Sequence, residues 1–130
     1  MSKSLREIER KIERTHAEFL QRQKAKWSQL IPEIAYVLLK CGATRRRAMM
    51  NEIAAEAFET YPHDFFTWFG QRRMPDHALI LLTLTEGKHR KWGYVAGDWF
   101  RGWRLTKKGL AFARDVDRRK KNRTHGFFTT

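Results

Sequence analysis

The chain has 130 residues, 42% of them hydrophobic and 13% aromatic, and its formal net charge at pH 7 is +13. These apolar side chains are enough to fill one core, so a disordered polyelectrolyte is excluded. The positive charge favours a polyanionic partner, nucleic acid or an acidic protein, although a surplus of Lys and Arg can also serve only to keep a surface soluble.

Cys41 is the single cysteine and follows an apolar run, so neither a disulfide framework nor a cysteine-based zinc site is expected. No apolar run approaches the length of about 18 residues that crosses a bilayer, and the charged N-terminus is not followed by the apolar segment of a signal peptide. We therefore expect a protein with no membrane contact. We place it in the cytoplasm, associated with the nucleoid if it binds DNA.

Residues 4–26 predict a long amphipathic helix, the core of an N-terminal helical arm over residues 1–28. Its narrow apolar stripe has spacings of three and four residues and contains Leu5, Ile8, Ile12, Thr15 and Phe19. Two uses of this stripe stay open. It can pack back onto the chain's own core, or Leu5, Ile8, Ile12 and Phe19 can form the seam of a homodimer or a contact with another protein.

Two helices of the core are expected next. Pro32 suits the first turn of a helix that ends at Gly42, and Thr44 can cap a second helix that ends before Tyr61. The first turn of this second helix would carry Arg45, Arg46 and Arg47. Three cations are unfavourable at the positive end of a helix dipole unless an anion lies nearby, so this run predicts phosphate contact.

Residues 61–77 contain Pro62 and Pro75 near their two ends and predict an irregular, buried connector. Its aromatic residues are expected in the core: Phe65, Phe66, Trp68 and Phe69. The following apolar run, residues 78–86, favours a helix over a strand, with Asp76, Thr83 and Glu86 on its polar face and Gly87 at its end.

Residues 92–109 predict a hairpin that leads into a helix. Aromatic and β-branched runs on either side of Gly97-Asp98 and Gly102 are typical of two short strands. Thr106 can cap a helix over residues 107–119, since its hydroxyl can accept an N–H from the first turn. The basic run that follows predicts a flexible tail over residues 120–130.

The predicted order of elements over about residues 30–119 resembles that of the winged helix-turn-helix superfamily. This order is two helices, a connector, a third helix, a hairpin and a last helix. The most family-like residues are the second strand and the cap, Gly102-Trp103-Arg104-Leu105-Thr106-Lys107-Lys108-Gly109. The expected fold class is therefore mainly α with a small β-hairpin wing. It comprises a winged-helix domain over residues 29–119 and the long N-terminal amphipathic helix.

The resemblance implies that the third helix, Pro75 to Glu86, enters the major groove of DNA and that the wing tip, Gly97 to Arg101, contacts the minor groove or the backbone. Carboxylates on the outer face of that helix depart from a DNA-reading pattern, so we expect weak sequence preference, or readout of DNA shape through Arg101 at the wing. The predicted DNA-binding residues are Arg45, Arg46, Arg47, Arg72, Arg73, His77, Thr83, Lys88, His89, Arg90, Lys91 and Arg101. Trp99 and Phe100 would stack on bases, meet a partner protein or fold down onto the core.

One pattern resembles a catalytic motif: Pro75-Asp76 and Glu86-Gly87-Lys88 match the written pattern of restriction-type nucleases, whose acids hold a metal ion. Ten residues separate Asp76 from Glu86, about 15 Å in a helix or about 33 Å in a strand, and nothing between them turns the chain. The histidines at positions 16, 63, 77, 89 and 125 have no metal-ligand spacing. We expect no enzyme, no cofactor and no metal site.

Two function hypotheses remain. The first is a DNA-binding protein, a small transcription regulator or a DNA-contacting accessory subunit, that holds duplex DNA largely through phosphates. The second is an adaptor or RNA-binding accessory subunit in which the winged helix docks a partner protein. Duplex binding separates the two.

Overall fold

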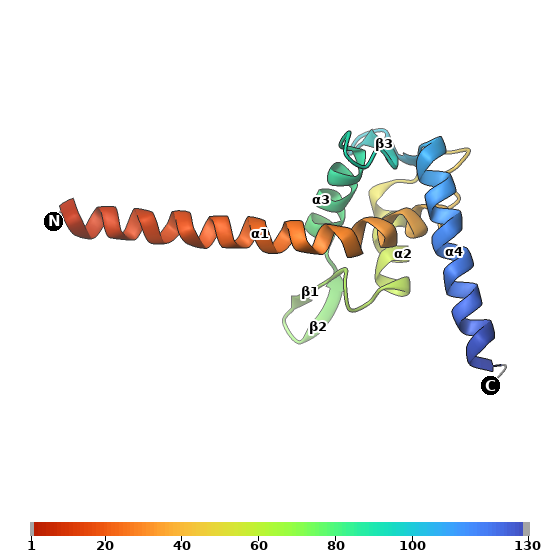
Figure 1. Ribbon diagram of the computed structural model, residues 1–130, viewed down its shortest axis with the longest axis horizontal. Coiled ribbons are helices and arrows are strands. Elements are labelled where there is room, and N and C mark those ends of the chain that lie inside the picture. Colours follow the sequence, from red (N-terminus) through yellow and green to blue (C-terminus); the bar gives the residue numbers. More distant parts are fainter. Residues whose placement is uncertain (1, 129–130) are drawn as a thin grey trace.

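The computed structural model describes the backbone of residues 2–128 and the side chains of residues 4–15 and 26–123 (Figure 1). Its elements in chain order are α1 (Ser2–Lys40), α2 (Met50–Thr60), β1 (Phe66–Phe69), β2 (Arg72–Pro75), α3 (His77–Lys88), β3 (Val95–Asp98), β4 (Gly102–Leu105) and α4 (Lys107–Phe128). The strands form two antiparallel hairpins, β1–β2 and β3–β4. The prediction of a mainly helical fold with a small β-hairpin is confirmed, and the first hairpin is an addition to it.

The first helix is continuous where the sequence predicted a break. Pro32 lies inside α1, which runs from Ser2 to Lys40. Proline removes one backbone donor, but Leu30, Ile31 and Ile34 are buried around it. Tertiary packing of that apolar face outweighs the local penalty and holds the helix together.

The N-terminal half of α1 extends away from the rest of the molecule as a single rod, and its C-terminal part runs between the other helices (Figure 1). On the rod, Leu5, Ile8 and Ile12 are 61%, 55% and 63% exposed. The alternative in which these side chains pack onto the chain's own core is therefore wrong. Phe19, the fourth residue of the predicted seam, lies outside the described side chains.

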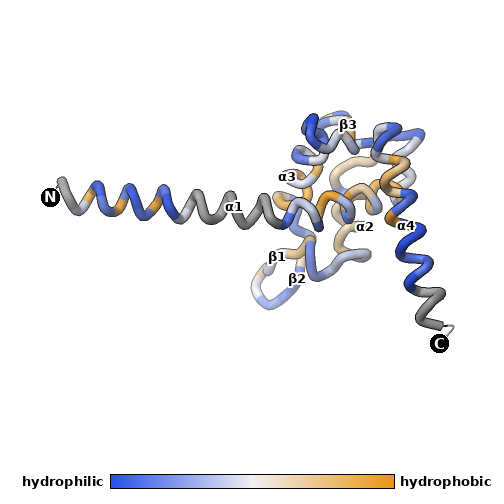
Figure 2. Tube along the Cα trace, viewed as in Figure 1, coloured by the Kyte–Doolittle hydropathy of each residue, from blue (hydrophilic) through white to orange (hydrophobic). Residues whose placement is uncertain are grey.

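The core lies where the C-terminal part of α1 meets α2, α3 and the β3–β4 hairpin. The largest fully buried side chains come from several elements and include Ile34, Leu38, Ile53, Phe65, Ile80 and Leu84. Figure 2 shows hydrophobic segments gathered at this junction, whereas hydrophilic and hydrophobic residues alternate along the rod of α1. Packing of one apolar stripe from each helix thus fixes the positions of α3 and the β3–β4 hairpin.

The segment between α1 and α2 consists of turns followed by an isolated β-bridge, rather than the start of a helix. Ala48 pairs with Trp103 of β4 through two backbone hydrogen bonds of 2.8 Å, and α2 begins only at Met50. The predicted cap at Thr44 and the helical placement of Arg45, Arg46 and Arg47 are therefore wrong. A pairing with a strand 55 residues later in the sequence overrides the local helix signal.

Residues 66–75 form the β1–β2 hairpin rather than a buried connector. Phe65 is buried as expected, but Trp68 and Phe69 are 60% and 76% exposed. The turn passes through Gly70, whose φ of +62° is accessible to glycine without strain. The hairpin projects from the molecule between α2 and α3 (Figure 1).

The start of α4 is held by Thr106 and Gly109, and the sequence predicted the cap at Thr106. The Thr106 hydroxyl accepts the N–H of Gly109 at 3.0 Å and donates to the carbonyl of Gly93 at 2.7 Å, so it caps α4 and fastens it to the turn before β3. A Cβ at Gly109 would overlap the carbonyl oxygen of Tyr94. Threonine and glycine are therefore both required where α4 meets the β3–β4 hairpin.

Beyond residue 119 the helix continues to Phe128, in place of the predicted flexible tail. Asp115 pairs with Arg119 at 2.8 Å and Asp117 with Lys121 at 3.1 Å, each four residues apart on the helix. The ammonium of Lys120 lies 4.8 Å from the ring centroid of Tyr36. The two ion pairs stabilise the extension of α4, and Lys120 contacts Tyr36 where α4 crosses the C-terminal part of α1 (Figure 1). In the part of the chain that the structure describes, no helix is both long and apolar enough to cross a membrane.

Candidate nucleic-acid interface

The outer face of α3 is largely apolar. Its exposed residues include Ala78, Leu82 and Thr85, and the Leu82 side chain is 53% exposed. Thr83 points the other way: it is fully buried and its hydroxyl donates to the Leu79 carbonyl at 2.7 Å. The prediction that Thr83 contacts DNA is therefore wrong, because Thr83 lies on the same helical face as Ile80 and Gly87. Thr85 is the threonine that faces solvent.

The two carboxylates expected on that outer face have structural roles. Asp76 caps α3 by accepting the N–H of Leu79 at 3.0 Å. Glu86 accepts the indole N–H of Trp92 at 3.1 Å. Both are half-buried, so the acidic face of α3 is less prominent than the sequence indicated.

Asp76 and Glu86 also belong to opposite ends of one helix, which keeps them about 15 Å apart along its axis. This pair does not converge on a metal ion. Among the residues that the structure describes, no three His, Cys, Asp or Glu side chains are grouped to hold one. Cys41, the residue after α1, is half-buried, and burial raises the pKa of its thiol to about 11.

Basic side chains surround the β3–β4 hairpin. The Lys88 ammonium at the end of α3 donates to the carbonyl of Gly97 at 2.8 Å, which places Lys88 beside β3, and Arg90 and Lys91 follow in the turn that leads to this strand. On the other side, Arg47 lies against Gly102, since a Cβ built there would be 3.2 Å from that of Arg47. We call this set the hairpin-flanking cluster; it comprises Arg47, Lys88, Arg90, Lys91 and Arg101.

Most of this cluster is not neutralised by the side chains that the structure describes. Arg101 has Asp98 at 4.0 Å, the outer limit of an ion pair. Within residues 26–123 no carboxylate lies at ion-pair distance from Arg47, Lys88, Arg90 or Lys91. Uncompensated cations on one side of a fold attract a polyanion and release its counterions when they bind it.

The three consecutive arginines divide into two kinds. Arg46 holds the loop together: its guanidinium contacts Glu52 at 2.9 Å and donates to the carbonyl of Cys41 at 3.0 Å. Arg45 and Arg47 are exposed and have no such partner in the described part of the chain. Phosphate contact therefore stays a prediction for Arg45 and Arg47. Arg46 has a structural role instead.

The tip of the β3–β4 hairpin is a tight turn that presents two aromatic rings. The Asp98 carboxylate accepts the N–H groups of Arg101 at 2.7 Å and Phe100 at 2.9 Å, and the Arg101 hydrogen bond is the main cause of the lowered pKa of Asp98. Trp99 is 57% and Phe100 is 82% exposed. The alternative in which they fold down onto the core is wrong. Stacking on bases and contact with a partner protein both remain open to them.

Three of the remaining predicted site residues lie at the other, N-terminal end of α3. Arg72 and Arg73 are in β2, and His77 is the exposed first residue of α3. His89 lies in the turn after α3, where its Nδ1 is 3.5 Å from the backbone nitrogen of Lys91. The predicted residues thus form two groups separated by the length of α3.

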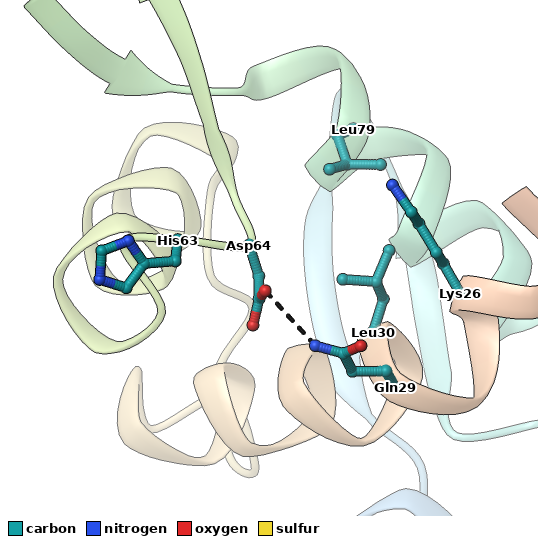
Figure 3. A pocket seen from close by; sticks show the side chains of 6 residues that line it. All are labelled: Lys26, Gln29, Leu30, His63, Asp64 and Leu79. Carbon is teal, nitrogen blue, oxygen red and sulfur yellow. Dashed lines mark hydrogen bonds between the residues drawn. The ribbon is translucent and has the colours of Figure 1, made fainter. Parts of the chain in front are cut away.

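A small cavity of about 120 Å³ lies where α1 meets the loop after α2 (Figure 3). The amide of Gln29 donates to Asp64 there at 3.4 Å. The nearby Glu33 is half-buried, and burial, followed by a hydrogen bond with Asp64, raises its pKa to about 8. The Gln29–Asp64 hydrogen bond joins this loop to α1, and the neighbouring Asp64 carboxyl favours the protonated form of Glu33. Periodicity alone could not reveal this pair, because 31 residues separate Glu33 from Asp64.

Trp68, Phe69, Leu82 and Thr85 are the exposed residues that sequence reasoning missed as candidates. The Gly70-Gln71 dipeptide between two short runs was the available signal for the hairpin that exposes Trp68 and Phe69. Comparison of the chain with protein-family models, curated proteins and solved structures gave no match. The functional argument therefore rests on the geometry.

Proposed function

We propose that this protein binds duplex DNA largely through phosphate contacts, as a winged-helix protein does. The observation that carries the proposal is the hairpin-flanking cluster, whose cations lie around the β3–β4 hairpin at the C-terminal end of α3. The order of α1, the Ala48 bridge, α2, α3 and the β3–β4 hairpin supports the winged-helix comparison. In this proposal α3 enters the major groove and the β3–β4 hairpin lies on the adjacent backbone.

The outer face of α3 supports weak sequence preference. Ala78, Leu82 and Thr85 lack the bidentate groups that read guanine or adenine, but apolar atoms and a threonine methyl can contact thymine methyl groups. Phosphate contacts position a protein and do not read sequence. This surface fits an accessory DNA-contacting subunit, or a transcription regulator that recognises its DNA site with little sequence preference. In this proposal the protein acts in the cytoplasm and needs neither a catalytic step nor a cofactor.

The test replaces Lys88, Arg90 and Lys91 with alanine in the full chain. Each phosphate contact contributes about 0.9 to the slope of log affinity against log salt, so we expect the slope to fall by about 2 to 3 and binding to weaken for all sequences alike. Fluorescence anisotropy with random-sequence duplexes across a salt series measures both quantities.

The matched control replaces Arg6, Arg10 and Arg14 with alanine. These residues are exposed on the rod of α1, and their replacement removes the same net charge as K88A/R90A/K91A. An equal fall of the slope in this control would show that total charge, not the hairpin-flanking cluster, binds the DNA. An unchanged slope in the K88A/R90A/K91A variant would refute the proposal directly.

A second candidate function is docking of a partner protein, favoured by exposed apolar side chains. Leu82 on α3 and Trp99 and Phe100 at the hairpin tip are all more than half exposed. Such residues are typical of the centre of a protein interface. If the full chain binds single-stranded RNA or an acidic protein but not duplex DNA, this second function replaces the first.

A further inference from the structure

The β1–β2 hairpin presents aromatic side chains and arginines on both of its faces. Residues directly opposite one another in an antiparallel pair share a face. Trp68 is opposite Arg73, and Phe69 is opposite Arg72. Each face therefore combines one exposed ring with one guanidinium.

On one face the ring is held in a preformed stack. The Arg73 guanidinium lies 5.6 Å from the Trp68 ring centroid and 4.9 Å from that of Phe66, and it contacts Nδ1 of His63 at 3.0 Å. Trp68 still exposes 60% of its surface. Its orientation is thus fixed before any ligand arrives, which lowers the entropic cost of binding.

On the other face Phe69 is 76% exposed, and it has no aromatic neighbour among residues 26–123. Met74, on the same face, is 44% exposed. A hairpin with two solvated faces buries little apolar surface of its own, so two large exposed rings need an explanation other than folding.

The tip of the β3–β4 hairpin has a similar composition. It carries a tryptophan, a phenylalanine and an arginine, Trp99, Phe100 and Arg101. The β1–β2 hairpin carries the same residue types in Trp68, Phe69 and the arginines of β2. One hairpin immediately precedes α3 and the other closely follows it. The proposed DNA-contacting helix thus has an aromatic, basic hairpin at each end.

We infer that the β1–β2 hairpin binds unpaired bases next to a duplex, with Trp68 and Phe69 stacking on the bases and Arg72 holding a phosphate. This inference rests on the proposed function and names its preferred substrate. Every base has a π face on which an aromatic ring can stack, and guanidinium groups track the backbone. No acidic residue occurs between residues 65 and 75, so the charge of the hairpin favours nucleic acid over a cationic or neutral partner.

The experiment compares two probes with the full chain. One is a fully paired duplex, and the other is the same duplex with a central stretch of unpaired bases that contains 2-aminopurine. We expect tighter binding to the second probe and quenching of 2-aminopurine fluorescence, because a base stacked on an aromatic ring loses emission.

The W68A/F69A variant should weaken binding to the unpaired probe about tenfold, with little effect on the paired duplex. The W68F/F69W variant keeps two aromatic rings and should restore both affinity and quenching. L5A/I8A is the matched control, since it removes two exposed apolar side chains from the rod of α1. At a protein concentration at which sedimentation shows the wild-type chain to be a monomer, this variant should change neither affinity nor quenching. Circular dichroism and the Tm verify that each variant folds.

The inference is overturned if the wild-type chain binds both probes equally, or if W68A/F69A weakens both probes to the same degree. It is likewise overturned if W68A/F69A changes only the binding to vesicles of anionic lipid. These results leave the proposed function standing, provided K88A/R90A/K91A lowers duplex affinity. If that triple variant leaves duplex binding unchanged while W68A/F69A removes quenching, the proposed function fails and the stacking hairpin stands.

Discussion

Glu33 is the residue whose protonation the fold changes most clearly. Its pKa rises from 4.5 to about 8, mainly because the carboxyl group is buried and then because Asp64 lies beside it. The folded protein therefore holds a proton that the unfolded chain releases near pH 4.5. Stability from this group is present at low pH and is lost as the pH rises through about 8.

Glu33→Gln should flatten that pH dependence. The amide stays neutral and can keep a hydrogen bond to Asp64, so we expect the variant to lose less stability than the wild type as the pH rises from 4.5 to about 8. Urea unfolding at several pH values measures the difference. Glu59→Gln, at an exposed position of α2, is the control and should leave the profile unchanged. A wild-type profile already flat in this range would contradict the assignment.

Single residues also show why some predictions of site residues succeeded and others did not. Thr106 was recognised as a cap because a cap depends on its own three-residue neighbourhood. The sequence predicts the wrong face for Thr83, because α3 is apolar around most of its circumference and periodicity does not single out one buried face. The face that packs inward was then decided by Val95 and Ile31, which approach Gly87 from other elements.

At the scale of elements, α4 depends on one close approach to the turn before β3. Gly109 lies against the Tyr94 carbonyl, and there is no room for a side chain. Gly109→Ala should destabilise the fold by about 1–3 kcal/mol, because α4 or the turn must shift to admit the methyl group. Thermal unfolding measures this loss.

Lys107→Ala is the control for that substitution. Lys107 is exposed in the same helical turn, so its replacement should stay within about 0.5 kcal/mol of the wild type. Because alanine has a higher helix propensity than glycine, a Gly109→Ala variant as stable as the wild type or more stable would contradict the role given to the contact with Tyr94.

Elements with strong local signals were predicted, and those set by distant contacts were not. The helical assignment of α3, the β3–β4 hairpin and the start of α4 followed from periodicity, turn residues and a cap. The loop before α2 was missed because Ala48 pairs with Trp103. The continuity of α1 through Pro32 was missed for the same reason, since buried neighbours on other helices hold it.

At the scale of the whole molecule, the rod of α1 contributes no contact to the core through its described apolar side chains. Ile8→Ser together with Ile12→Ser should therefore leave the Tm of the dilute protein unchanged, because both side chains are already more than half exposed. Differential scanning calorimetry at low concentration tests this expectation.

The same variant tests the predicted dimer seam. If two copies pair through Leu5, Ile8 and Ile12, the molar mass of the wild type in sedimentation should rise with concentration, and that of I8S/I12S should not. Equal mass for both proteins at every concentration would contradict the homodimer. Low salt should be avoided, since the net charge of +13 makes copies repel one another.

Because α1 has no break between Leu5 and Leu30, it fixes the distance between its N-terminal end and the core. Twenty-five helical residues measure about 38 Å, and none of that length contains a hinge. A partner protein bound at the N-terminal end of α1 would be held at a set distance and angle from the nucleic acid that α3 and the two hairpins are proposed to contact. Inserting or deleting one residue in the rod would rotate that partner by about 100°, and a whole turn would be needed to restore its orientation.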